Sequence, residues 1–211
     1  MTETGISTGT RGVFVLADIS GYTAFLQAVA GAHGEQMAAM SEVPAAYPLM
    51  TTLLDGIVEQ LAPPFRLSKL EGDAVFAYAP DAEFQLRGGS VLECIRRCYA
   101  NYRVQRDKTE NLMLCECHAC STLQTLDLKF VLHRGEYVAQ AIAGHEELLG
   151  PDVTMAHLLL KNTVTNIVGR GAYALLTVSA TQHLQIPLDG SVPHTEHYEH
   201  YPPVEGHIFR L

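Results

Sequence analysis

A carboxylate followed at once by a helix start is the first feature of the sequence that could do chemistry. Asp18 follows an apolar run at 13–17 that predicts a buried strand, and Ser20-Gly21 then opens a helical pattern. The free backbone N–H groups of a first helical turn can hold phosphate oxygens, and Asp18 can hold the magnesium that accompanies a polyphosphate. The same residues are ordinary helix starters, so this segment alone supports either interpretation.

A second set of charged residues lies around a tight turn between two expected strands, 66–70 and 74–78. Lys69 stands near the end of the first strand, and Asp73 precedes the second. A hairpin brings both residues to one edge of a sheet, where two aspartates from neighbouring strand ends can form a two-metal site. A polar turn without any chemistry is the alternative.

Soft metal ligands gather in a segment that we expect to be a loop. They are Cys115, Cys117, His118 and Cys120. Closely spaced thiolates and an imidazole can hold a soft metal ion, above all zinc. The fourth ligand would be His118, or else Cys94 or Cys98 on the preceding helix. A reduced or redox-active thiol cluster is the alternative, and an iron–sulfur cluster would require a clear fourth cysteine.

The apolar pattern predicts the elements that must position these residues. They are a strand at 13–17, a helix opening at 20–21, a helix at 44–61, a hairpin of 66–70 and 74–78, a helix at 88–106, a second hairpin of 126–133 and 136–142 turning at Arg134-Gly135, a helix at 151–161, a strand at 173–178, a short helix at 179–183 and a last strand at 207–211. Helices separated by hairpins predict an α+β domain of the ferredoxin-like, split βαβ type, with helices on one face of an antiparallel sheet. We expect a flexible lead at 1–11 and a single domain at 12–211.

Composition and charge exclude several classes of protein. The 211 residues are 47% hydrophobic and 18% charged, which is typical of a folded domain. The formal net charge of −9 disfavours a nucleic-acid partner. No stretch approaches the ~20 apolar residues of a membrane span. The clustered cysteines and the polar N-terminus, which resembles no secretory signal, predict a cytoplasmic protein without a membrane anchor.

Four segments, taken together and in this order, resemble the motifs of the class III adenylyl and guanylyl cyclases. They read ADISGYTAFL, KLEGDAVFAYA, LHRGEYV and LLGPDVTMAHLLL, and they extend from Ala17 to Leu160. The details of the last segment and the cysteine cluster resemble a cyclase-like family of unknown function more than the proven enzymes. The resemblance implies a nucleotidyl-cyclase-type fold and a head-to-tail homodimer with two sites at its interface, each lined by both subunits.

The resemblance also assigns roles to individual residues. Asp18 and Asp73 match the two metal-binding aspartates, which would hold magnesium or manganese against the triphosphate. Lys69 matches the lysine that recognises adenine from the other subunit. Its acidic partner falls on Glu147, one methylene longer than the aspartate of the family. The turn that binds phosphates through its backbone corresponds to Ile19, Ser20, Gly21, Tyr22 and Thr23.

The chain departs from the cyclases where they stabilise the transition state. With Gly150 aligned to the motif glycine, the family's asparagine falls on Thr154 and its arginine falls on Leu158. Leucine cannot donate to a developing negative charge, and the loss of one such donor typically costs roughly 10²–10³ in rate. Lys161, further along the same helix, does not match the arginine in angular position.

Three functions follow from this pattern. The first is a homodimeric cyclase-fold module that binds a nucleotide or magnesium polyphosphate with weak or no cyclase activity, in a regulatory role. The second is an active adenylate cyclase, a phosphorus–oxygen lyase that converts ATP to cyclic AMP and pyrophosphate. The third is a structural metal-binding module with a vestigial cyclase site.

Overall fold

The computed structural model describes residues 9–38, 43, 46–112 and 117–211. Within these residues the strands form one sheet in the order β2-β3-β1-β4-β6-β8-β7, and β5 pairs with β4 outside this path. The strands are β1 (Thr10–Ser20), β2 (Arg66–Glu71), β3 (Ala74–Pro80), β4 (Asp127–Ile142), β5 (His145–Leu149), β6 (Tyr173–Thr177), β7 (Val192–Glu196) and β8 (Val204–Arg210).

The helices cover the sheet and connect its strands. They are α1 (Tyr22–Ala38), α2 (Ala46–Leu61), α3 (Gly89–Leu112), α4 (His118–Ser121), α5 (Pro151–Leu158), α6 (Thr165–Val168) and α7 (Val178–Leu184), with 3-10 turns η1 (Thr122–Thr125) and η2 (Leu159–Lys161). Mixed helices and strands in this arrangement confirm the predicted α+β class. No helix in the described part of the chain is long and apolar enough to cross a membrane.

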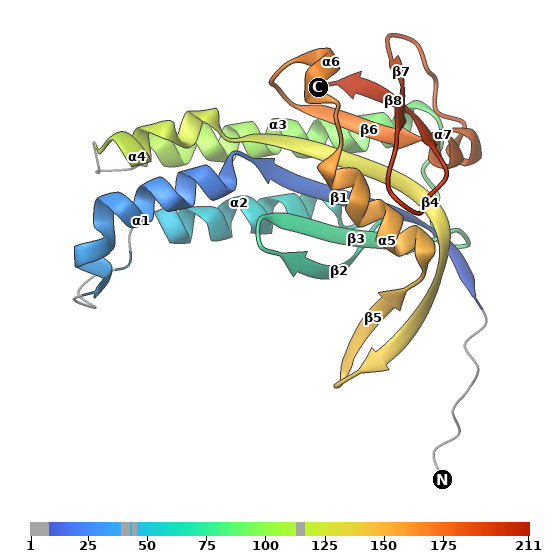
Figure 1. Ribbon diagram of the computed structural model, residues 1–211, viewed down its shortest axis with the longest axis horizontal. Coiled ribbons are helices and arrows are strands. Elements are labelled where there is room, and N and C mark those ends of the chain that lie inside the picture. The colour runs from blue at the N-terminus through green and yellow to red at the C-terminus, as the bar shows by residue number, and fades with distance from the viewer. Residues whose placement is uncertain (1–8, 39–42, 44–45, 113–116) are drawn as a thin grey trace.

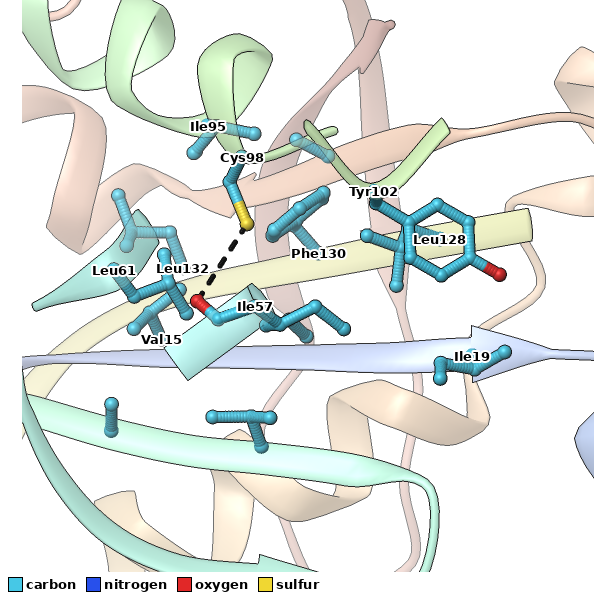
Figure 2. Close-up of a cluster of buried hydrophobic side chains, with 14 of the residues drawn as sticks. Val15, Ile19, Ile57, Leu61, Ile95, Cys98, Tyr102, Leu128, Phe130 and Leu132 are labelled. Carbon is cyan, nitrogen blue, oxygen red and sulfur yellow. Dashed lines mark hydrogen bonds between the residues drawn. The ribbon is translucent and has the colours of Figure 1, made fainter. Parts of the chain in front are cut away.

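Successive residues of β1 point to opposite faces of the sheet and belong to two separate cores. Val13 and Val15 pack with α1, α2, α3 and α7, whereas Phe14 and Leu16 pack with α5 and α6. Figure 2 shows the first core, where Cys98 on α3 lies beside Ile57 on α2 above the sheet. The prediction that helices cover one face was therefore wrong, because β1 is apolar at every position from 13 to 17 and needs cover on both sides.

The predicted second hairpin was wrong. β4 continues straight through Arg134 and Gly135, because its ladder with β1 runs without a break from Ser20↔Asp127 to Thr10↔Tyr137. The turn to β5 comes later, at Ala143-Gly144, where both residues adopt positive φ. Figure 1 shows the β4–β5 hairpin projecting from the body of the molecule.

Three other features of the fold also differ from the sequence-based prediction. Helix α3 continues to Leu112, past the predicted end at 106. β4 and β6 run parallel, so the sheet is not purely antiparallel. β7 lies in a stretch for which the sequence predicted no strand, and it tolerates Pro193 because it is an edge strand paired only with β8.

Candidate functional site

The two aspartates that the sequence singles out meet where β1 ends. Asp18 is paired with Ala74 of β3 in the sheet, and the Ile19 N–H donates to the Asp73 carbonyl at 3.2 Å. Burial and the neighbouring charge of Asp18 raise the pKa of the Asp73 carboxyl to about 6. Two neighbouring carboxylates repel each other when both are ionised. A divalent cation would stabilise the ionised pair, because its positive charge offsets that repulsion.

Lys129 already supplies part of that positive charge. It faces Asp18 across the β1–β4 ladder, and its Nζ lies 2.7 Å from Asp18 Oδ2. The same ammonium donates to the Leu160 carbonyl at 3.0 Å, so it ties the strand end to the segment after α5. The carboxylate pair with Lys129 has a formal charge of −1, which weakens its attraction for a second cation. The sequence reasoning missed Lys129, since only the register of β4 brings it to Asp18.

The phosphate turn predicted from Ile19, Ser20, Gly21, Tyr22 and Thr23 spans the end of β1 and the start of α1. Gly21 has a φ of 90°, and its carbonyl accepts the first helical bond from Phe25 N at 3.0 Å. A cavity of about 730 Å³ opens beside this turn, and its lining includes Ser20, Gly21 and Arg170, with Asp127 as the acidic member. No motif around Arg170 predicted its place near the turn.

The structure brings Lys69 and Glu147 together from strands far apart in the sequence. Lys69 Nζ lies 3.0 Å from Glu147 Oε2 and 3.4 Å from Glu71 Oε1. The hydrogen bond to Glu147 raises the pKa of Lys69 above its ordinary value. Nearby, His157 Nδ1 lies 3.1 Å from Glu71 Oε2. Lys69 and Glu147 remain about one-third exposed, which leaves both side chains accessible to a ligand.

Helix α5 carries the residues at the two transition-state positions. Thr154 is exposed, and its hydroxyl donates back to the Gly150 carbonyl at 3.3 Å. Leu158 is half-buried against the core that contains Phe14 and Leu16. Lys161 is exposed at the end of η2. None of these side chains has a described contact with Asp18 or Asp73.

A polar network that the sequence did not predict fixes the start of α5. Asp152 Oδ2 accepts the Glu136 N–H at 2.7 Å, and Asp152 Oδ1 lies 3.6 Å from Nε2 of the buried His133. His133 Nδ1 lies 3.0 Å from the Thr177 hydroxyl. A Cβ added at Gly135 would lie 2.2 Å from the Asp152 Cβ. Glycine at 135 is therefore required for space beside α5, and not for a turn.

The cysteines divide into two groups. Cys98 is a core residue: its thiol lies 3.9 Å from the Ile57 carbonyl, and burial raises its pKa to about 12. Cys94 is also buried on α3. Cys117 and Cys120 lie together at α4, where His33 of α1 joins them. Of the other predicted ligands, Cys115 lies outside the described residues, as does the side chain of His118.

Solved structures share this fold at low sequence identity. The adenylyl cyclase CyaB from P. aeruginosa has a TM-score of 0.66 at 12% identity, covering 97% of this chain and 96% of the cyclase chain. The guanylyl cyclase Cya2 also has a TM-score of 0.66 at 12% identity, covering 96% of this chain and 92% of that one. A bacterial light-regulated adenylyl cyclase has a TM-score of 0.64 at 13% identity, covering 97% of this chain and 52% of that one. The chain therefore has the class III nucleotidyl cyclase fold, as the sequence motifs predicted.

Residues 50–167 match a family model described as "Protein of unknown function (DUF2652)", and the chain belongs to that family. One relative is the uncharacterized protein Rv2561/Rv2562 of Mycobacterium tuberculosis, 36% identical over 117 residues. That match covers 54% of this chain and 52% of the relative, so the matched region spans about half the length of each protein.

Proposed function

We propose that this chain is a homodimeric cyclase-fold module that binds a nucleoside triphosphate with magnesium and has weak or no cyclase activity. The observation that carries the proposal is the carboxylate pair of Asp18 and Asp73, held at the end of β1 beside the first turn of a helix. Carboxylates next to free helix N–H groups suit a cation that shares phosphate oxygens.

Recognition of adenine is supported by the contact between Lys69 and Glu147. A lysine donor next to a carboxylate acceptor matches a purine edge that offers both an acceptor ring nitrogen and a donor amino group. The pair is partly exposed, so a ligand would replace the mutual contact at modest cost. Guanine presents a different arrangement of donors and acceptors, which favours ATP over GTP.

Weak turnover is supported by α5 and by Lys129. Thr154 and Leu158 provide no cationic donor for a charge developing on the transferring phosphorus. Lys129 competes with a metal ion for the Asp18 carboxylate. The first feature reduces transition-state stabilisation, and the second weakens metal binding in the ground state and the transition state alike.

A homodimer is supported by the apolar surface around the base-recognition pair. The side chains concerned are 44–50% exposed, and they lie on β2 and on the projecting β4–β5 hairpin (Figure 1). They are Leu67, Leu70, Ile142 and Leu149. Exposed apolar side chains concentrated on adjoining strands are typical of a protein interface.

An active adenylate cyclase is the second candidate, because the metal-binding pair and the adenine-recognition pair are both present. The two candidates differ in whether the bound ATP is converted efficiently to cyclic AMP and pyrophosphate. The third function, a structural metal module with a vestigial site, predicts that magnesium and ATP do not bind at all.

Calorimetric titration of purified protein with Mg²⁺ and ATP is the test. We expect binding that requires magnesium, that is lost in Asp18→Asn, and that survives in the surface control Asp189→Asn. Mass spectrometry of the same mixtures is expected to find little or no cyclic AMP. The double variant Thr154→Asn/Leu158→Arg, which restores the family's side chains, is expected to raise the yield of product.

Two results would contradict the proposal. Rapid formation of cyclic AMP that disappears in Asp18→Asn would establish the active cyclase instead. Absence of any magnesium-dependent binding in the folded wild-type protein would support the third function, a structural metal-binding module with a vestigial cyclase site.

A further inference from the structure

Three soft ligand atoms converge on one point between α1 and α4. His33 Nε2 lies 3.2 Å from Cys117 Sγ and 3.7 Å from Cys120 Sγ. All three ligand atoms lie within 4.8 Å of one another, and the group is half-buried to buried. His33 and the cysteines come from segments separated by 84 and 87 residues, so the fold alone makes the cluster.

The spacing of these atoms matches a tetrahedral metal site. Zinc binds thiolate at about 2.3 Å and imidazole at about 2.0–2.1 Å, which puts tetrahedral nitrogen and sulfur ligands roughly 3.6 Å apart. The two nitrogen–sulfur distances lie on either side of that value. Moreover, the Cys120 N–H donates to Cys117 Sγ at 3.4 Å, a bond that favours the thiolate needed for coordination.

We propose that His33, Cys117 and Cys120 bind a soft divalent metal ion, zinc by preference, and that this ion is structural. The proposal replaces His118 by His33 as the histidine ligand of the predicted cluster. Cys115 stays a sequence-based prediction, and the site does not depend on it.

The position of the site gives the ion a structural role. His33 lies in α1, the helix that begins at the phosphate turn, and Cys117 and Cys120 lie at α4, directly before η1. The cavity beside that turn has α1 as one wall and η1 residues Thr122 and Thr125 as another. A metal bond between α1 and α4 therefore holds two walls of this cavity at a set distance. It also supplies folding free energy that two short polar contacts would not.

Metal analysis of the full chain, purified under reducing conditions without added chelator, tests the proposal. We expect roughly one zinc ion per chain by elemental analysis, falling to near zero in Cys120→Ser and in His33→Asn. The matched controls are Cys94→Ala, a buried cysteine outside the cluster, and His200→Asn, an exposed histidine. Both controls are expected to keep the metal.

Cobalt substitution of the wild-type protein gives a readout that does not depend on variants that fold. A tetrahedral cobalt site with thiolate ligands produces intense visible absorption and a sulfur-to-metal charge-transfer band. We expect both features in the wild-type protein, and we expect them to be lost in His33→Asn.

Any of three results would overturn the proposal. One is wild-type protein that contains no metal and gives no cobalt spectrum after loading in the presence of reductant. Another is stoichiometric metal that persists in folded Cys120→Ser or His33→Asn. A disulfide between Cys117 and Cys120 in protein kept under reductant would equally exclude the site, since a disulfide sulfur is no longer a thiolate ligand.

Discussion

Lys129 is the residue whose position most changes the expected chemistry of the site. A lysine that forms an ion pair with Asp18 neutralises the carboxylate that a magnesium ion would need. The ammonium is also held by the Leu160 carbonyl, so it is positioned from two sides. Metal binding at Asp18 therefore requires displacing this ammonium or accepting its repulsion.

Replacing Lys129 by methionine should strengthen metal binding. Without the ammonium the carboxylate pair carries a formal charge of −2, and we expect the affinity for free Mn²⁺ to rise by about tenfold. Electron paramagnetic resonance of unbound Mn²⁺ measures this affinity, with Lys161→Met as the exposed control. Unchanged affinity would mean that Lys129 does not compete for the site.

Asp152 links residue chemistry to folding stability. The His133 ring, 3.6 Å away, is the largest cause that lowers the pKa of Asp152, and the Glu136 N–H and the Arg11 charge act in the same direction. A carboxyl whose pKa is lower in the folded state stabilises the fold above its unfolded pKa of about 3.9. That contribution is lost as the pH falls through the folded value.

Asp152→Asn should therefore lower the free energy of unfolding at neutral pH, and the deficit should shrink as the pH falls below about 4. Urea unfolding curves measured from neutral to acid pH, with Asp189→Asn as the exposed control, show this convergence. A deficit that stays constant with pH would mean that the loss does not come from the ionised Asp152 carboxylate.

At the scale of elements, the junction of β4 and α5 decides where the altered transition-state residues lie. Gly135 in β4 leaves room for Asp152 at the start of α5, and Asp152 in turn accepts the N–H that follows Gly135. The glycine in the third cyclase-like segment thus positions a helix. Thr154 and Leu158 depend on this junction, because both are on that helix, which is only eight residues long.

Gly135→Ala should destabilise the fold and displace α5. A Cβ that meets Asp152 Cβ at 2.2 Å must push the helix away, which we expect to cost roughly 1–3 kcal/mol. Urea unfolding measures the loss, and Gly89→Ala, whose new Cβ meets nothing within 4 Å, is the matched control. Asp152→Gly introduced into Gly135→Ala should recover part of the stability. No recovery would mean that the strain lies elsewhere.

At the scale of the whole molecule, the proposed sites need two chains. The resemblance to the class III cyclases implies that each site has two halves from different chains. The metal half contains Asp18 and Asp73 of one chain, and the base half, which would recognise adenine, contains Lys69 and Glu147 of the other. Within one chain these halves lie at different places on the same sheet. A single subunit would therefore contribute the metal half of one site and the base half of the other.

Mixing two inactive variants should restore binding. Asp18→Asn removes every metal half, and Lys69→Ala removes every base half, so each homodimer should bind Mg–ATP poorly. A mixed dimer has one complete site of two, and random exchange of equal amounts makes about half of the dimers mixed, so we expect about a quarter of the wild-type capacity to return on mixing. Calorimetry and light scattering of the mixture measure capacity and mass. Chains that never exceed monomer mass would contradict the dimer itself.

The sequence by itself determined the fold class, because four separated segments and the alternation of hairpins and helices pointed to the same architecture. It also singled out Asp18 with Asp73 and Lys69 with Glu147, and the structure places the members of each pair close together. The binding roles of these four residues stay predictions.

Only the tertiary structure decided which residues from distant segments meet. Lys129 reaches Asp18 through strand register, His33 reaches Cys117 and Cys120 through the packing of α1 on α4, and Gly135 meets Asp152 through a helix–sheet contact. The Arg134-Gly135 pair looked like a turn because glycine is common in turns, yet the ladder with β1 continues through it. Long-range pairing overrode the local preference, and no short-range pattern in the sequence encodes that competition.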